Sequence, residues 1–156
     1  MSGHTDNRIV IDAPIDVVWR LTNDVASWPQ LFTEYAAAEI LEQTEDMVRF
    51  RLTKHPDENG TVWSWVSERH LDAEAREVLA HRVETGPFEF MRIRWSYREV
   101  EGGTEMRWVQ HFRMKPTAPV DDAEMTRRID AGTAGQMPHI KQLVEAEARR
   151  LAGAAA

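Results

Sequence analysis

One stretch of the sequence places an arginine among tryptophans at the spacing of a β-strand. Side chains alternate between the two faces of a strand. One face of this strand therefore carries Trp63, Trp65, Ser67 and Arg69. Small-molecule pockets are lined by apolar and aromatic side chains with a few placed polar groups. The pattern predicts a ligand cavity that contains a fixed cation.

An inward-facing Arg69 has two possible explanations. Burial of an uncompensated charge costs free energy, so the first is an ion pair with a core carboxylate, such as Glu34 or Glu84. The second is a wet cavity, in which the guanidinium holds a ligand carbonyl or a developing enolate oxygen. The sequence alone leaves both explanations open.

A second aromatic group lies earlier in the chain. Trp28, Phe32 and Tyr35 recur at helix-like spacing. A helix packed on a sheet would account for this spacing, and such packing is common. The more specific interpretation is a cavity wall, with the Tyr35 hydroxyl as a proton donor or acceptor.

Two later strand-like segments repeat the pattern of bulky apolar faces. One face of the first segment carries Met91, Ile93, Trp95 and Tyr97, and one face of the second carries Met106, Trp108, Gln110, Phe112 and Met114. The opposite face of the first segment carries Arg92, Arg94 and Arg98. We expect these arginines to be solvated, or to contact an acidic carrier domain. The bulky faces are expected to point towards the same cavity.

Several other chemistries find no support in the sequence. There is no cysteine, which excludes disulfides and thiolate metal sites. The six histidines are scattered, and none has a second ligand at metal-binding spacing. No phosphate loop, dinucleotide fingerprint or nucleophile triad is present. We expect no metal and no cofactor.

The elements that must position these residues can be read from turn signals and periodicity. A strand is predicted over 8–12, a helix begins near Pro14, and a short helix follows Ser27. Six strands are then predicted over 38–44, 47–54, 61–71, 76–85, 90–100 and 104–114. Asn59-Gly60 and Gly102-Gly103 mark two of the turns between them.

The last part of the chain predicts one long helix. Asp121 and Glu124 resemble a capping box, with the aspartate as the cap. Apolar residues recur at near-helical spacing at Met125, Ile129, Met137, Ile140, Val144 and Leu151. Pro138 predicts a kink or a break. The order of elements favours an α+β fold, with a curved antiparallel sheet of about seven strands around a long C-terminal helix.

Length and composition limit the class of protein. The 156 residues fit a single domain, placed over 1–152, with a flexible tail over 153–156. The net charge of −7 argues against nucleic acid and anionic membranes as partners. The first residues lack the features of a signal peptide, and no apolar stretch approaches membrane-spanning length. We expect a cytoplasmic location.

The sequence resembles the single-domain aromatase/cyclases of bacterial aromatic polyketide synthases, of the tetracenomycin and spore-pigment type. Four segments that cover much of the chain carry the resemblance: 23–32, 62–67, 81–88 and 102–110. The resemblance implies a helix-grip fold, shared with START lipid-transfer domains and plant pollen allergens. It also implies an acyl carrier protein bearing a polyketide, and the minimal polyketide synthase, as partners.

The resemblance also implies roles for individual residues. Arg69 is similar to the family's central cavity arginine, and Tyr35 to its proton-transferring tyrosine. The residues that resemble its cavity lining are Trp28, Phe32, Trp63, Trp65, Ser67, Met91 and Trp95. To this lining we add Phe88, Trp108, Gln110, Met125 and Ile129. The chain ends with the predicted helix, so we expect no methyltransferase domain and no methylation.

The implied function is first-ring closure on a carrier-bound, unreduced poly-β-ketone. The ring would join the ninth and fourteenth carbons by an aldol reaction, and loss of water would give the aromatic ring. A cyclase that closes the seventh-to-twelfth ring is an alternative. So is a two-domain type of aromatase that acts on reduced chains. A non-catalytic binding or lipid-transfer protein of the same fold is a further alternative from another class. Arg69, Tyr35 and Ser67 favour the enzyme, because a lipid carrier needs fewer polar groups.

Overall fold

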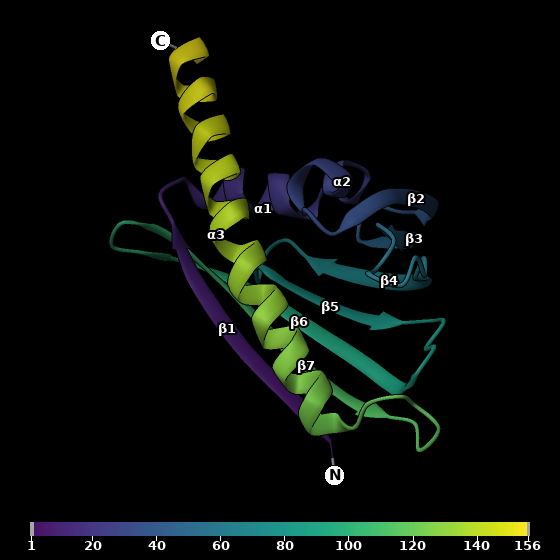
Figure 1. Ribbon diagram of the computed structural model, residues 1–156. Coiled ribbons are helices and arrows are strands. Elements are labelled where there is room, and N and C mark those ends of the chain that lie inside the picture. The colour runs from purple at the N-terminus through teal and green to yellow at the C-terminus, as the bar shows by residue number, and fades with distance from the viewer. Residues whose placement is uncertain (1, 156) are drawn as a thin grey trace.

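The computed structural model describes residues 2–155, which form one seven-stranded antiparallel sheet and a long helix (Figure 1). The elements are β1 (Gly3–Ile11), α1 (Ile15–Asn23), a 3-10 turn η1 (Val25–Ser27), α2 (Trp28–Leu31), β2 (Tyr35–Gln43), β3 (Met47–Lys54), β4 (Ser64–Asp72), β5 (Glu77–Arg82), β6 (Phe88–Val100), β7 (Gly103–Met114) and α3 (Asp122–Ala155). This order and architecture confirm the predicted α+β fold.

The strands follow the order β1-β7-β6-β5-β4-β3-β2 across the sheet. From β2 to β7 each strand pairs with the next one in the chain, and β1 returns to pair with β7. The short helices α1 and α2 join β1 at one edge to β2 at the other. They close one end of the sheet, while α3 crosses its concave side next to β1 (Figure 1).

The predicted Gly102-Gly103 turn joins β6 to β7. Gly103 has a φ of +134°, a backbone conformation that side chains disfavour. A Cβ at this position would lie 2.1 Å from the carbonyl oxygen of Ile11. Glycine therefore allows the hairpin to approach the end of β1.

The helix α3 agrees with the predicted long helix at its start and differs from it at Pro138 and at its end. The Asp121 carboxylate accepts a hydrogen bond from the backbone N–H of Glu124 at 2.8 Å, which confirms the aspartate cap. The helix is continuous through Pro138, so a break at this proline is ruled out. The helix also continues to Ala155, so the expected flexible tail is helical through residue 155, and residue 156 lies outside the described residues.

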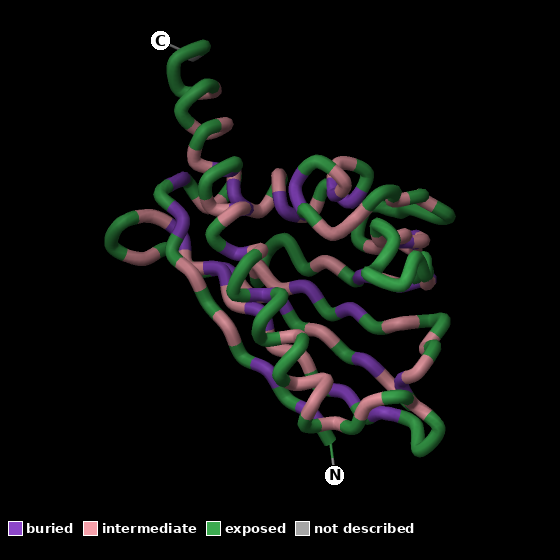
Figure 2. Tube along the Cα trace, in the orientation of Figure 1, coloured by how far each residue is buried: buried purple, intermediate pink, exposed green. Residues whose placement is uncertain are grey.

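Two apolar clusters form the interior, and both lie on the concave side of the sheet (Figure 2). The larger combines inward side chains of the strands with α1, α2 and three residues of α3, namely Met137, Ile140 and Val144. The smaller comprises Phe88, Met91, Phe112 and Met114, with Met125 and Ile129 of α3 packed against them. The strand alternation predicted for β6 and β7 is confirmed by this burial.

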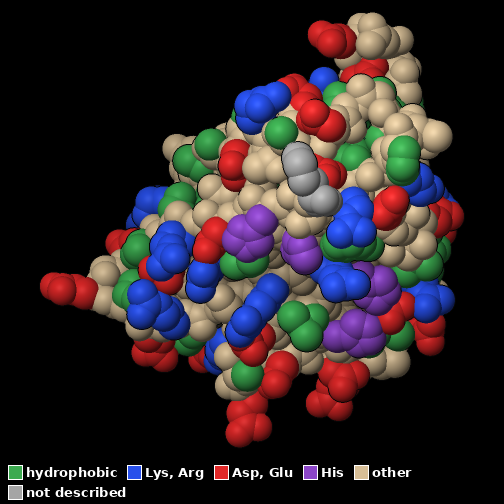
Figure 3. Space-filling view, turned by 90° about the horizontal axis from the view of Figure 1, so that it is seen from below, with side chains coloured by type: hydrophobic (Ala, Val, Ile, Leu, Met, Phe, Trp, Pro, Cys, Tyr) green, Lys and Arg blue, Asp and Glu red, His purple; other side chains and the backbone are tan. Residues whose placement is uncertain are grey.

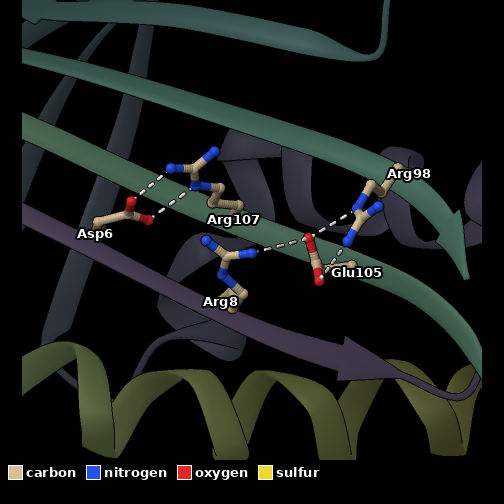
Figure 4. Close-up of polar contacts among 5 residues, drawn as sticks. All are labelled: Asp6, Arg8, Arg98, Glu105 and Arg107. Carbon is tan, nitrogen blue, oxygen red and sulfur yellow. Dashed lines mark hydrogen bonds and ion pairs between the residues drawn. The ribbon is translucent and has the colours of Figure 1, made fainter.

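The outer face of the sheet is charged. Arg107 binds Asp6 across β7 and β1, and Glu105 binds Arg98 with Arg8 3.9 Å away (Figure 4). Lysine, arginine and histidine side chains lie among aspartates and glutamates on the surface seen from below (Figure 3). The charged pairs therefore lie on the outer face, and the apolar interior lies on the concave face.

Candidate active site

Arg69 lies in the middle of β4, between Val48 of β3 and Ala80 of β5. Its side chain points inward, as predicted, and the residue is only 2% exposed. The guanidinium carbon is 4.9 Å from the ring centroid of Trp28 and 4.3 Å from that of Trp95. A cation in contact with two ring faces is stabilised electrostatically by both.

The predicted ion pair of Arg69 with Glu34 or Glu84 is absent among the described residues. Glu84 instead binds Arg51 through two hydrogen bonds of 3.0 and 3.1 Å, and Glu34 lies 3.8 Å from Lys54. Both carboxylates pair with cations at the surface, because the charges keep their hydration there and avoid the free-energy cost of burial. The ion-pair explanation for the buried arginine is therefore wrong.

Arg69 has a neutral partner in place of a carboxylate. Its Nη2 donates to the Asn23 side-chain oxygen at 2.6 Å, and its buried Nε has no hydrogen-bond partner within the described chain. Burial lowers the pKa of Arg69 to about 10, opposed by the Tyr97 and Tyr35 hydroxyls, so the group is still a cation at neutral pH. A buried donor without a partner needs an explanation, and a ligand oxygen would provide one.

The six residues Trp28, Phe32, Tyr35, Trp65, Trp95 and Trp108 form a continuous aromatic cluster around Arg69, with centroid separations from 4.4 to 6.3 Å between contacting rings. All six positions were predicted from strand faces or helical spacing. The helix containing Trp28 ends at Leu31, however, so Tyr35 comes from the first residue of β2. The predicted neighbours thus meet through a helix-to-strand turn.

The Tyr35 hydroxyl is held in its neutral form. Burial raises the pKa of Tyr35 well above its ordinary value, and the Glu34 carboxylate raises it further. Arg82 and Arg69 act in the opposite direction. At neutral pH the phenol is therefore protonated, so its hydroxyl can donate a hydrogen bond but carries no negative charge.

Arg82 of β5 is a second cation near the cluster that the prediction missed. Its guanidinium carbon lies 4.1 Å from the ring centroid of Trp65 and 4.7 Å from that of Phe88. Burial lowers its pKa to about 10, and the Tyr35 hydroxyl opposes this shift. The alternation of buried Val78 and Ala80 on the same strand could have shown that Arg82 also faces inward.

Trp63, which was predicted to line the cavity, lies at the surface. It belongs to the loop before β4, it is 45% exposed, and its indole N–H donates to Asp57 at 3.0 Å. The strand was predicted to start at 61, but the described strand starts at Ser64, so the alternation does not apply to Trp63. Its placement in the cavity lining is therefore corrected.

The remaining predicted residues lie on β4 and β7 or in the smaller apolar cluster. Ser67 is buried on β4 opposite Arg82, and Gln110 is half-buried on β7 opposite Ile93. Phe88, Met91, Met125 and Ile129 belong to the smaller apolar cluster. Arg82 connects the two clusters, because its guanidinium contacts Trp65 of one and Phe88 of the other.

The aromatic rings contact one another where the open cavity was expected. A ligand that enters this cluster would have to separate some of them. A surface hollow of about 590 Å³ lies elsewhere, lined by Asp12, Ile15, Glu99, Arg149 and neighbouring residues between the β6–β7 hairpin and the end of α3. It is separate from Arg69, so it is not the predicted cavity.

Residues 11–136 match the family of polyketide cyclases/dehydrases and lipid-transport proteins. The chain belongs to this family. The matched range includes all seven strands except most of β1, and it includes every member of the aromatic cluster. The resemblance seen in the sequence is thereby confirmed.

Two relatives within the polyketide cyclase/dehydrase and lipid-transport family are similar over long stretches. A Streptomyces cyaneus protein assigned as a polyketide cyclase is 57% identical over 145 residues, which cover 93% of this chain and 95% of that protein. A Streptomyces halstedii protein with the same assignment is 62% identical over 109 residues, which cover 70% of this chain and all of that protein.

A solved structure shows the same fold. The Zhui aromatase/cyclase of a Streptomyces species superposes with a TM-score of 0.78, over 96% of this chain and 95% of its own, at 22% identity. Identity at this level supports the fold alone. Within residues 2–155, no helix is long and apolar enough to cross a membrane, and no group of three acidic or histidine side chains is arranged to hold a metal ion.

Proposed function

We propose that the protein is a polyketide aromatase/cyclase that closes the first ring of an unreduced poly-β-ketone. The observation that carries the proposal is the buried Arg69, charged, without a carboxylate partner and with a free Nε among aromatic rings. A ligand that satisfies this donor must present an oxygen acceptor in flat, apolar surroundings. A folded poly-β-ketone has both features.

The reaction requires control over which ring is closed more than it requires a strong base. Methylenes between two carbonyls are already acidic, so a free chain cyclises in several ways. Binding in one geometry brings a single methylene carbon close to a single ketone carbon. Ring contacts of the aromatic cluster favour a chain that is becoming planar. The protein would therefore act mainly by selecting one fold of the substrate.

The polar groups have complementary roles in the aldol step. A carbon–carbon bond forms between the enolate carbon and the attacked ketone carbon, and negative charge moves to the ketone oxygen. Arg69 stabilises this oxygen. Tyr35, neutral because burial raises its pKa, gives the oxygen its proton. Water held by Ser67 is a second route for protons. Loss of the resulting hydroxyl as water and enolisation of the two ketones in the ring then give the aromatic ring.

The finer features of the proposal follow the resemblance. We propose that the substrate is tethered to an acyl carrier protein and that the ring joins the ninth and fourteenth carbons. Closure of the seventh-to-twelfth ring is the competing regiochemistry. The family also includes lipid-transport proteins, but a carrier of apolar lipids has no evident use for two inward cations such as Arg69 and Arg82.

Reconstitution of a minimal polyketide synthase with and without the protein tests the function. Adding the wild-type protein should replace a mixture of spontaneous products with one aromatic regioisomer, identified by mass spectrometry and NMR. An unchanged mixture, together with binding of aromatic polyketides, would instead indicate a carrier.

Arg69→Ala should return the products to the spontaneous mixture. Loss of a preorganised donor to a developing oxyanion lowers turnover by roughly 100-fold or more. Arg94→Ala is the matched control, because Arg94 pairs with Glu77 on the outer face of the sheet. Circular dichroism should show that both variants are folded. Normal product from Arg69→Ala would refute the role of this arginine.

A further inference from the structure

A partly buried hydrogen-bond network joins Arg69 to residues outside the aromatic cluster. Asn23, the last residue of α1, accepts from Arg69 Nη2 at 2.6 Å. Its amide nitrogen donates to the Trp19 carbonyl at 2.9 Å and to the Tyr97 hydroxyl at 3.4 Å. The network therefore joins the helix α1 to the strands β4 and β6 at Arg69.

The hydrogen atoms in this network can be assigned from the number of donors. Thr22 has one hydroxyl hydrogen, and it donates to the Val18 carbonyl at 2.7 Å. In the 2.7 Å contact between the Thr22 and Tyr97 hydroxyls, Tyr97 must then be the donor. The Tyr97 oxygen is free to accept from Asn23.

This assignment fixes the orientation of the Asn23 amide. Both of its N–H groups are used, on the Trp19 carbonyl and the Tyr97 oxygen. A flipped amide would place a donor against the donors of Arg69 and an oxygen against the Trp19 carbonyl. The carbonyl oxygen of Asn23 therefore faces the guanidinium, and the network holds it there.

The burial and charge of these groups distinguish the contact from an ordinary arginine pair. Thr22 is fully buried, and Tyr97 is 5% exposed. Burial raises the pKa of Tyr97 to about 12, so it adds no negative charge near Arg69 at neutral pH. Elsewhere in the fold, Arg49, Arg51 and Arg107 bind carboxylates. Arg69 alone among these four is held by an amide.

A neutral acceptor has a consequence that a carboxylate would not have. It fixes one nitrogen of the guanidinium fork but leaves the positive charge uncompensated. The unpartnered Nε remains available to a ligand oxygen. The same segment also holds one of the flanking rings, because the Trp28 indole N–H donates to the Thr22 carbonyl at 3.1 Å.

We propose that Asn23 is a positioning residue, which orients Arg69 towards the substrate oxygen and preserves its full charge, with Tyr97 and Thr22 as its support. The proposal rests on the cyclase function. It explains why position 23 carries an amide. Selection of one ketone oxygen requires that the Arg69 guanidinium is both oriented and positively charged. An acidic residue at position 23 would orient the guanidinium but would neutralise its charge.

Asn23→Asp is the sharpest test, because the side chains are nearly equal in size. The new carboxylate would pair with Arg69, but its second oxygen would face the Trp19 carbonyl and the donor to Tyr97 would be lost. These effects oppose one another, so the melting temperature should stay close to that of the wild type. Turnover in the reconstituted synthase should fall roughly 100-fold, as for Arg69→Ala, because the substrate oxygen loses the cation's charge. If Asn23 only supported the fold, a stable Asn23→Asp variant would keep its activity, and that result would overturn the proposal.

Asn23→Ala and Tyr97→Phe separate direction from charge. Both keep the cation but loosen its orientation, so total product should persist while the single regioisomer gives way to a mixture. Thr104→Val is the matched control, since Thr104 is buried and donates to the Ala13 carbonyl at 2.8 Å, just before the start of α1, whereas Asn23 is the last residue of that helix. It should lower stability without changing the product ratio.

A second measurement does not depend on catalysis. The Nε–H resonance of Arg69, followed by NMR, should be well resolved in the wild type, averaged in Asn23→Ala and shifted in Asn23→Asp. Equal signals in wild type and Asn23→Ala would overturn the positioning role. If the synthase assay shows no cyclisation by the wild type, the function fails, while this signal still decides whether Asn23 orients Arg69.

Discussion

The two tyrosines of the chain show how burial selects a protonation state. Tyr35 and Tyr97 both lie against an arginine, which lowers a phenol pKa, yet burial is the larger effect and raises both. The result is a pair of neutral hydroxyls. One lies in the aromatic cluster, where it can donate to a substrate, and the other supports Asn23.

Ionisation of both tyrosines should therefore be delayed in the folded protein. At pH 10, where a free phenol is half ionised, the native protein should show little phenolate absorbance. The unfolded chain loses these protons first, so the free energy of unfolding should fall as the pH rises from about 10 towards about 12. An ultraviolet titration with circular dichroism as the control for unfolding checks this. Normal titration of two tyrosines in folded protein would contradict it.

At the scale of elements, much of the site was predictable because strand alternation is a local property. The inward faces of β6 and β7 could be read directly, and so could the direction of Arg69 on β4. Trp63 could not, because the start of β4 depends on how the preceding loop folds around Asp57. One shifted boundary moved a tryptophan from the predicted cavity to the surface.

Contacts between distant elements lay beyond the sequence. Asn23 and Arg69 are 46 residues apart, and their meeting depends on how α1 packs against the sheet. Arg82 is a different case, because the alternation of Val78 and Ala80 on its strand does predict an inward direction. Its contacts with Trp65 and Phe88, however, depend on how neighbouring strands lie side by side. The cluster was therefore predicted as a set of rings, while the groups that orient and flank its cation were not.

Substitution of two glycines, Gly103 at the start of β7 and Gly135 in α3, tests the effect of backbone conformation on stability. Gly103→Ala should destabilise the fold by roughly 1–3 kcal/mol or more, because φ is +134° and the added carbon meets the Ile11 carbonyl. Gly135→Ala should instead stabilise it by about 0.5–1 kcal/mol, since this helical position is exposed and has space for a methyl group. Urea unfolding measures both. Equal effects of the two substitutions would show that backbone conformation is not the cause.

At the scale of the whole molecule, polar groups divide sharply between the two faces of the sheet. The outer face neutralises its arginines with carboxylates, as in the pairs of Arg107 with Asp6 and Arg98 with Glu105 (Figure 4). The concave face holds Arg69 and Arg82 against aromatic rings. The two faces of the sheet thus hold their arginines differently, with carboxylates on the outer face and aromatic rings on the concave face.

This division predicts how the molecule responds to acid. Arg107 lowers the pKa of Asp6, Arg49 that of Glu68 and Arg98 that of Glu105, in each case by hydrogen bonding the carboxylate. A carboxyl group whose pKa is lowered by folding stabilises the protein above its unfolded pKa, and this contribution is lost as the pH falls.

The free energy of unfolding should accordingly be steady at neutral pH and decline below about pH 4.5, as measured by urea unfolding across a pH series. Glu105→Gln removes one such group and should make the decline shallower. Added salt should weaken the same pairs at neutral pH, because their arginines are exposed to solvent.

No carboxylate contacts Arg69 within residues 2–155, so binding of a neutral hydroxyanthraquinone should persist wherever the fold does. Loss of that binding before unfolding would show that acidic groups also contribute to the concave face.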